Sequence, residues 1–253
     1  MNDFFRVGEE FTNHEGFKMY GLIHISWLIG MFVVGMLITK YFCGLDQYRR
    51  DKFKKKFAIF FFVLELSRHL LIAYRGYYTL DNLPMHLCSF MIFISIIQAF
   101  VKSQTLNESL FLLSIPGALA ALLFPDWVSK PPFIYTTVHS FLTHGLLILY
   151  VSMQLKSKDI VPDITNVPWV FIPLAFASIL MFFVNKAWNT NFFFMNVPSP
   201  GSPLVFLEKI FGNPGYVFGL AVLVIIVWCI EYFIYGIIRK RDEKRSPKIP
   251  KYF

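Results

Sequence analysis

The stretch YGLIHISWLIGMFVVGMLITKYF at residues 20–42, followed by CGLDQYRRDKFKKK at 43–56, decides the fold of this chain. The first part is almost wholly apolar and reaches the length of about 20 residues that a helix needs to cross a bilayer. The second part carries six basic residues between Arg49 and Lys56, as the positive-inside rule expects of a cytoplasmic loop. Together they predict a transmembrane helix that ends on the cytoplasmic side.

The composition indicates that this pattern continues along the chain. Of the 253 residues, 56% are hydrophobic and 19% are aromatic, and the mean hydropathy is +0.54. The net charge of +8 comes largely from two clusters, because seven further basic residues lie between Arg239 and Lys251. Both clusters directly follow apolar runs, so they indicate membrane topology rather than a nucleic-acid partner. Attraction to anionic lipid headgroups is compatible with that role.

Seven apolar runs are each near the length of a bilayer crossing, which predicts an all-α integral membrane protein with a seven-transmembrane-helix bundle. The fourth run is short and contains Pro116-Gly117, a pair that kinks a membrane helix where neighbours satisfy the freed backbone groups. The runs cover approximately residues 20–42, 57–74, 83–101, 109–124, 132–155, 168–188 and 215–238.

The loop charges predict the orientation of this single membrane domain. If residues 43–56 are cytoplasmic, the N-terminus lies outside, and an odd number of spans places the C-terminus inside. The basic segment 239–253 agrees with a cytoplasmic tail. Residues 189–214 then form the longest outer connection, and their apolar character predicts a folded segment on the outer face with a short interfacial helix.

Ionisable and polar residues gather in the predicted outer half of the bundle. A charged side chain at the bilayer centre costs roughly 2.5–3.5 kcal/mol on insertion scales, so such residues usually face a bundle interior or a wet cavity. Because the helices run in alternating directions, chance alone does not readily place these ionisable residues in the same leaflet. The residues are His24, Glu65, Arg68, His69, His86, Cys88, His139, His144, Asn185 and Lys186.

Helical phase divides this set. Glu65, Arg68 and His69 are spaced i, i+3 and i+4, so they share one helix face. A Glu65–Arg68 pair on that face either orients His69 or an incoming headgroup, or simply sets helix registry as a buried ion pair.

The remaining candidates do not pair within a helix. His86 and Cys88 differ by about 200° around a helix, and His139 and His144 by about 140°. Thr143 lies on the face of His139. Any site is therefore assembled between helices.

Cofactor signals are weak. Cys43, Cys88 and Cys229 form no disulfide framework or zinc-ribbon pattern, and His139 and His144 lack the HExxH spacing. We expect no cofactor, although histidines from separate helices leave Zn²⁺ open as an alternative.

Four segments carry a family resemblance: FKMYGLIHISWL at 17–28, LPMHLCS at 83–89, HSFLTHG at 139–145 and NFFFMNVPSPGSPL at 191–204. Together they resemble the YwaF-type family of bacterial integral membrane proteins over nearly the whole chain. That family is similar to a human seven-span acyltransferase that acts on ether phospholipids and, more remotely, to membrane hydrolases of fatty-acid esters.

The resemblance implies a lipid-active fold in a bacterial cytoplasmic membrane, with an intramembrane Cys or Thr nucleophile and a histidine. The histidine of the human motif matches His86, whereas its cysteine precedes that histidine directly, where this chain has Met85. Cys88 lies three positions after Met85, on the same helix face.

These observations support a lipid-active membrane enzyme that transfers or hydrolyses an acyl chain. In this hypothesis Cys88 is the nucleophile, with His139 or His144 as the base, because a weak nucleophile needs an adjacent base. The expected partners are membrane lipids and a small-molecule or lipid substrate. The alternative is a transporter or binding protein for a small ion, proton or metabolite, and a third class is a receptor or assembly factor whose polar core only fixes packing. His86 is included with Cys88, His139 and His144 among the expected catalytic residues. The residues expected to bind substrate are Glu65, Arg68, His69, His24, Asn185 and Lys186.

Overall fold

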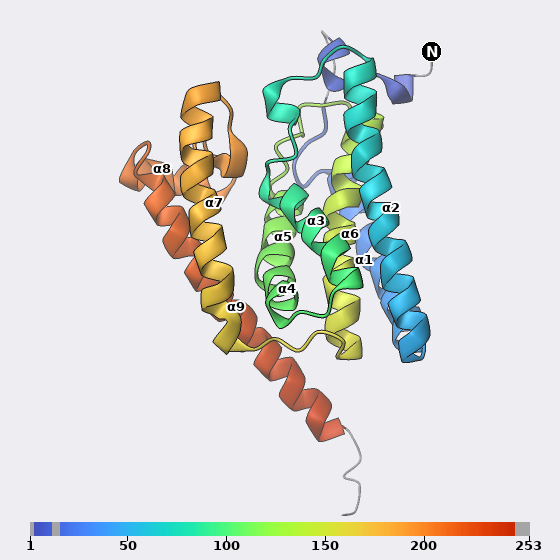
Figure 1. Cartoon of the computed structure of the whole chain (residues 1–253). Helices are drawn as coiled ribbons and strands as arrows, with labels where there is room; N and C mark the ends of the chain where they lie inside the picture. The colour runs from blue at the N-terminus through green and yellow to red at the C-terminus, as the bar shows by residue number, and fades with distance from the viewer. Residues whose placement is uncertain (1–2, 12–15, 246–253) are drawn as a thin grey trace, which may run out of the picture.

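A computed structural model of the chain describes residues 3–11 and 16–245, and every regular element within those ranges is helical (Figure 1). Seven helices are long and apolar enough to cross a membrane. The chain is therefore a multi-pass, all-α membrane protein, as predicted. These spans cover Leu22–Cys43, Gln47–Tyr74, Leu80–Phe100, Gln104–Leu123, Tyr135–Ser157, Ile164–Trp188 and Tyr216–Asp242.

The helices form a main bundle, α1 to α6, and a second layer made of α7 and α9 on one side of it (Figure 1). Within the bundle, α6 packs against α1, α2 and α5, and α2 packs against α3. The short helix α8 packs against α9. The bounds are α1 Leu22–Cys43, α2 Gln47–Tyr74, α3 Leu87–Phe100, α4 Gln104–Ser109, α5 Ile115–Leu123, α6 Tyr135–Ser157, α7 Val167–Trp188, α8 Pro203–Phe211 and α9 Tyr216–Arg245.

The helix of the second span begins at Gln47, so residues 47–56, which were expected to form a loop, are helical, and the predicted crossing at 57–74 lies within α2. Asp46 caps the helix by accepting a hydrogen bond from the Arg49 backbone N–H at 2.9 Å, which satisfies one of the free donors of the first turn. Arg50 and Lys54 on these turns pair with Asp159 at 3.2 and 3.4 Å. The basic cluster is thus part of α2 and ties it to the α6–α7 connection.

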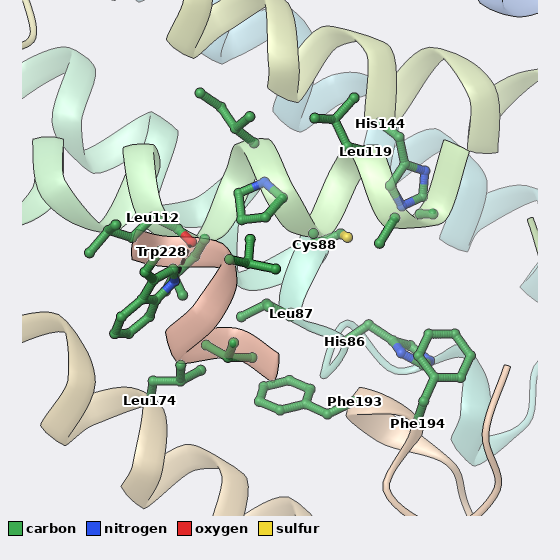
Figure 2. A pocket seen from close by; sticks show the side chains of 18 of the residues that line it. His86, Leu87, Cys88, Leu112, Leu119, His144, Leu174, Phe193, Phe194 and Trp228 are labelled. Atoms are coloured by element: carbon green, nitrogen blue, oxygen red, sulfur yellow. Dashed lines mark hydrogen bonds between the residues drawn. The ribbon is translucent and has the colours of Figure 1, made fainter. Parts of the chain in front are cut away.

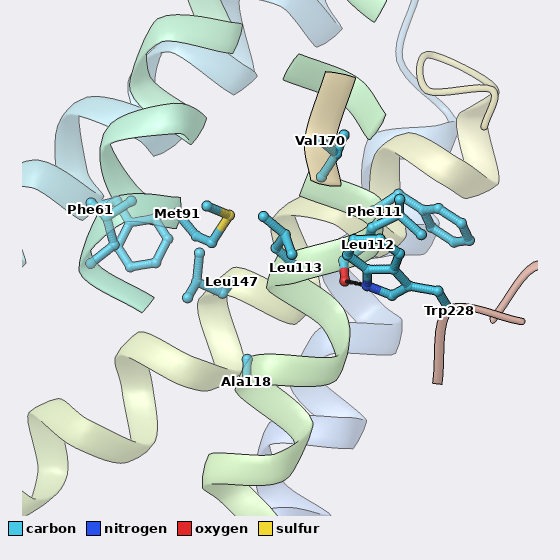
Figure 3. Packing of buried hydrophobic residues seen from close by; sticks show 10 residues of the cluster. Phe61, Met91, Phe111, Leu112, Leu113, Ala118, Leu147, Val170 and Trp228 are labelled. Atoms are coloured by element: carbon cyan, nitrogen blue, oxygen red, sulfur yellow. Dashed lines mark hydrogen bonds between the residues drawn. The ribbon is translucent and has the colours of Figure 1, made fainter. Parts of the chain in front are cut away.

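The fourth span contains a π-helical turn at Leu110–Ser114 between α4 and α5. Pro116 explains it, because proline has no N–H and cannot donate to the carbonyl four residues earlier. That carbonyl belongs to Leu112, and it accepts a hydrogen bond from Trp228 Nε1 of α9 at 2.8 Å (Figure 3). The kink predicted at Pro116-Gly117 therefore takes the form of a π turn that α9 completes.

Buried apolar side chains surround this turn and join the two layers (Figure 3). Phe61 of α2, Met91 of α3 and Leu147 of α6 belong to the same cluster as Val170 of α7 and Trp228 of α9. The α7–α9 layer is therefore fastened to the bundle at the level of the π turn.

The connection 189–214 is folded, as predicted, and contains the short helix α8. Ser202 caps α8 through its side chain, which accepts from the Leu204 N–H at 3.3 Å. The short 3₁₀ helix Asp3–Phe5 near the start of the chain and the end of α9 lie at opposite ends of the molecule (Figure 1), as an odd number of crossings requires. Residues 239–245 of the predicted basic tail continue α9, and residues 246–253 lie outside the described ranges.

The N-terminal segment is fastened to the end of α2 by an ion pair between Glu10 and Arg75. Arg75 Nε donates to Glu10 Oε1 at 2.6 Å, and the Val7 N–H donates to the same oxygen at 3.0 Å. The bond from Arg75 lowers the pKa of Glu10 from its ordinary value of about 4.5 to about 2.

This pair predicts an acid-sensitive anchor. Because the pKa of Glu10 is lower in the folded state, its stabilising contribution is complete above about pH 4.5 and is lost as the pH falls toward about 2. We expect hydrogen exchange of residues 3–11 to stay constant from pH 7 to about 4.5 and to accelerate below it, after correction for intrinsic rates. Glu10→Gln should exchange rapidly throughout; a protected Glu10→Gln segment would contradict the prediction.

The Trp228 bond predicts a specific loss of stability. Trp228→Phe keeps the packing but leaves the Leu112 carbonyl without its donor, which costs about 1–3 kcal/mol for a buried group. We expect a lower thermal midpoint for the detergent-solubilised variant. Trp169→Phe is the matched control, because Trp169 is 63% exposed and its replacement should change stability by about 0.5 kcal/mol or less. Equal effects of the two changes would argue against the role of the bond.

Candidate functional site

A cavity of about 1680 Å³ lies between the α7–α9 layer and helices α3, α5 and α6. Apolar side chains form most of its wall. Along α9 the lining runs from Val217 to Asp242, which corresponds to about 37 Å of helix at 1.5 Å per residue. The cavity is therefore long and narrow, and it follows the direction in which the helices cross the membrane.

Cys88 and His144 are neighbours on the cavity wall (Figure 2). His144 Nδ1 is 2.7 Å from the Ser140 carbonyl oxygen. Because a carbonyl only accepts, Nδ1 carries the hydrogen in the neutral ring and Nε2 is left with a lone pair. Trp127 stacks on the ring at 5.4 Å and 15°. The ring of His144 is thus held in one orientation near a thiol.

The start of α3 adds a favourable field at the thiol. Cys88 is the second residue of the helix, and the N-cap residue His86 makes no side-chain capping bond. The first N–H groups of a helix have no intrahelical acceptor, and this end carries a partial positive charge that stabilises an anion. Negative charge that forms at the sulfur, or on an oxygen beside it, is stabilised here.

Behind this pair, Glu65 of α2 joins three helices. Its Oε1 accepts a hydrogen bond from Ser89 Oγ of α3 at 3.1 Å and lies 3.4 Å from His69 Nε2. Its Oε2 lies 3.4 Å from His139 Nε2 of α6. Thr143 contacts the His139 ring at 3.4 Å, on the shared face that the sequence predicts. A buried carboxylate is therefore surrounded by donors, as a low-dielectric interior requires.

The predicted Glu65–Arg68 ion pair is wrong for the described residues, because Glu65 contacts histidines and Ser89 instead. Arg68 lines the cavity, as do Asp81 and Asp126. No hydrogen bond or ion pair joins the Arg68 guanidinium to another residue in ranges 3–11 and 16–245. Its charge is thus available toward the cavity.

His86 lines the same end of the cavity, where aromatic side chains enclose it. Its ring lies 5.2 Å from the Phe192 ring and 5.9 Å from the Phe194 ring. Phe193 and Phe194 adopt left-handed φ values of 58° and 54°, which are unfavourable for bulky residues. The surrounding loop therefore holds these rings against α3 at a conformational cost.

The family model of the TMEM164 family matches residues 19–232, which is most of the chain. The chain belongs to the TMEM164 family. The matched range includes the start of α1, most of α9 and the cavity residues Glu65, Arg68, His86, Cys88 and His144. No curated protein and no solved structure matches the chain.

Four residues predicted to bind substrate, His24, His69, Asn185 and Lys186, do not line the cavity of this TMEM164-family protein. His24 is fully buried; its Nδ1 accepts from the Tyr20 N–H at 3.0 Å and its Nε2 donates to the Leu122 carbonyl at 2.7 Å. Both ring nitrogens are therefore engaged in joining α1 to the end of α5.

Asn185 and Lys186 are two more of the four. Asn185 folds the following loop, because its amide donates to the Phe192 carbonyl and accepts from the Phe192 N–H, both at 2.8 Å. Lys186 is exposed and lies 5.7 Å from the Phe182 ring. His69 is also displaced, since it contacts Tyr78 and Glu65 behind the wall.

Several residues on the wall were not predicted: Ser89, Trp127 and Trp228. Ser89 directly follows Cys88, and only the contact with Glu65 reveals its role. Trp127 lies in a short connection, where an aromatic residue carries no functional signal in the sequence alone. The role of each of these residues is recognised only from its contact with a residue that is distant in the sequence.

The histidines do not form a metal centre. Among the described residues, no group of three or more His, Cys, Asp or Glu side chains is arranged to hold a metal ion. Glu65 lies between His69 and His139, while His144 faces Cys88. Glu65, His69 and His139 therefore form one group through the contacts of Glu65, whereas His144 has a different neighbour.

The Glu65 contacts predict a large effect on folding. Glu65→Ala leaves Ser89, His69 and His139 without their acceptor in a buried site, and we expect a loss of about 3 kcal/mol or more, as for broken buried pairs. Asp51→Ala is the control on the same helix, because its pair with Lys54 is near the helix end and contributes about 0.5 kcal/mol. Thermal unfolding in detergent measures both. Similar stabilities would show that Glu65 does not hold the three helices together.

Proposed function

We propose that this TMEM164-family protein is a membrane enzyme that transfers or hydrolyses the acyl chain of a lipid, with Cys88 as nucleophile and His144 as base. The observation that carries the proposal is the Cys88–His144 contact on the wall of a long apolar cavity. A nucleophile, an adjacent base and a third group that orients the base form the recurring arrangement of covalent acyl transfer. Here the Ser140 carbonyl is the orienting group.

The reaction proceeds in two balanced steps. The Cys88 thiol gives its proton to His144 Nε2 while the sulfur attacks the ester carbonyl carbon, and the carbon–oxygen bond of the ester breaks. The leaving alcohol takes the proton from His144, and the acyl group remains on sulfur as a thioester. An acceptor hydroxyl or water then gives its proton to His144 and attacks the thioester, and the departing Cys88 sulfur recovers that proton.

His144 fits the role of base better than His139. The lone pair of His144 Nε2 faces the thiol, because Nδ1 donates to the Ser140 carbonyl. His139 is directed to Glu65 at 3.4 Å and is buried with a side-chain exposure of 3%. We assign His139, His69 and Glu65 the task of holding α2, α3 and α6 so that Cys88 meets His144.

Membrane lipids are the proposed substrates. The apolar wall accepts an acyl chain, while Arg68 and His86 at the other end of the site suit an anionic headgroup. The resemblance to YwaF-type proteins and to the human ether-phospholipid acyltransferase supports this assignment, with Cys88 in place of a cysteine at Met85. We place the protein in a bacterial cytoplasmic membrane, with its N-terminus outside and its basic C-terminal end inside.

A second candidate function rests on the Glu65 cluster. A buried carboxylate between His69 and His139 resembles the acid–histidine chains that relay protons in pumps and transporters. Under this alternative the cavity carries a small ion, proton or metabolite, and the thiol is not required.

The cysteines allow a matched test of the enzyme. We expect Cys88→Ala to abolish acyl transfer or release by the purified protein in phospholipid vesicles, and His144→Ala to lower the rate by about 10²–10⁴, as for loss of a general base. Cys43→Ala and Cys229→Ala are the controls, since neither residue lines the cavity. Mass spectrometry of the wild type should find the acyl adduct on Cys88 alone.

Two outcomes would overturn the scheme. Full activity of a folded Cys88→Ala variant excludes the covalent route. Proton-coupled uptake into liposomes that requires Glu65 and His139, but not Cys88, supports the transport alternative instead.

A further inference from the structure

The cavity extends well beyond Cys88, toward the opposite end of the bundle. From Val217 to Trp228, all the α9 residues on its wall are apolar. Opposite them lie Leu174 of α7 and Leu112 of the π turn (Figure 2). After Ile230, the first polar α9 residue on the wall is Glu231, about 21 Å along the helix from Val217. The apolar part of the wall that leads to Glu231 is here called the chamber.

Glu231 stands out because both of its carboxyl oxygens are buried and neither has a hydrogen-bond partner within residues 3–11 and 16–245. The neighbouring acid, Glu108, provides none. Its Oε2 accepts from the Asp163 N–H at 2.8 Å, and its Oε1 accepts from the Tyr232 hydroxyl. Glu231 therefore does not join helices through these hydrogen bonds. A role in setting helix registry does not explain why its carboxyl group is buried here.

The character of the wall changes at this residue. On the Cys88 side the α9 wall of the chamber is apolar and the facing stretch of α7 contributes the hydroxyl of Ser178, whereas beyond Glu231 the lining includes Lys156, Arg239 and Asp242. An apolar chain that follows α9 toward this end therefore meets its first ionisable α9 side chain at Glu231. Covering that group with an apolar chain removes its remaining access to polar partners, which is unfavourable.

We propose that Glu231 marks the far end of a chamber that holds the long fatty-acyl chain of a membrane lipid and selects that chain by its length. The inference rests on the proposed function, since it places the acyl carbonyl at Cys88. A chain that ends before Glu231 is buried mainly against apolar residues and covers no ionisable α9 side chain. A longer chain must cover the carboxyl group and binds less tightly.

Two substitutions should move the length limit in opposite directions. Glu231→Leu removes the polar group and extends the apolar wall, whereas Ala221→Phe fills part of the chamber from α9. Val222→Phe is the matched control, because Val222 adjoins Ala221, is 43% exposed and does not line the cavity. Glu231→Gln keeps a polar group at the same place and should behave as the wild type.

The test compares binding of laurate, palmitate and behenate to the purified full-length protein, by competition against radiolabelled palmitate. We expect Glu231→Leu to improve behenate binding relative to palmitate by about tenfold, the effect of sparing one buried polar group. Ala221→Phe should weaken palmitate relative to laurate by about tenfold or more. Val222→Phe should leave the order unchanged.

Binding needs no thiol chemistry, so the two proposals fail separately. Cys88→Ala should bind the three fatty acids in the same order of affinity as the wild type. If this variant also keeps activity, the covalent mechanism is excluded but the proposed chamber is not. An unchanged order in folded Glu231→Leu and Ala221→Phe overturns the chamber, as does a shift produced equally by Val222→Phe. If Glu231→Leu fails to fold, the comparison of Ala221→Phe with Val222→Phe tests the proposed chamber by itself.

Discussion

Much of this structure depends on one constraint: a polar group buried in the bundle has to find its partner inside the protein, because the bilayer core holds no water to replace it. The Leu112 carbonyl is the clearest case. Pro116 withholds the N–H that would bind it, the helix widens into a π turn, and Trp228 of α9 donates instead. This bond and the apolar cluster around it fasten the α7–α9 layer to the bundle, and the cavity lies between the two.

The same constraint shapes the site. The Glu65 carboxylate contacts side chains of α2, α3 and α6, and these contacts hold the three helices together. The Ser140 carbonyl, already part of α6, receives the Nδ1 hydrogen of His144 and leaves Nε2 facing the Cys88 thiol. The role that we propose for Cys88 thus depends on satisfied hydrogen bonds nearby, and Glu231 is notable because its oxygens have no such partner among the described residues.

Some features of the site were accessible from the sequence. Apolar length identified the seven spans, and spacing showed that His139 and His144 face different directions. The start of α2 was missed because basic residues continue a helix beyond the bilayer as readily as they form a loop. His24 and Asn185 were assigned to substrate because a buried polar residue looks alike in sequence whether its partner is a ligand or a backbone carbonyl.

The sequence by itself determined the class of fold, the number of crossings and the direction of each side chain around its own helix, because these depend on local hydropathy and on the fixed geometry of a helix. Only the tertiary structure decided which histidine meets Cys88, that Glu65 pairs with histidines rather than Arg68, and that the cavity continues to Glu231. These contacts join helices that are distant along the chain, and helical phase carries no information about the neighbour that a face will meet.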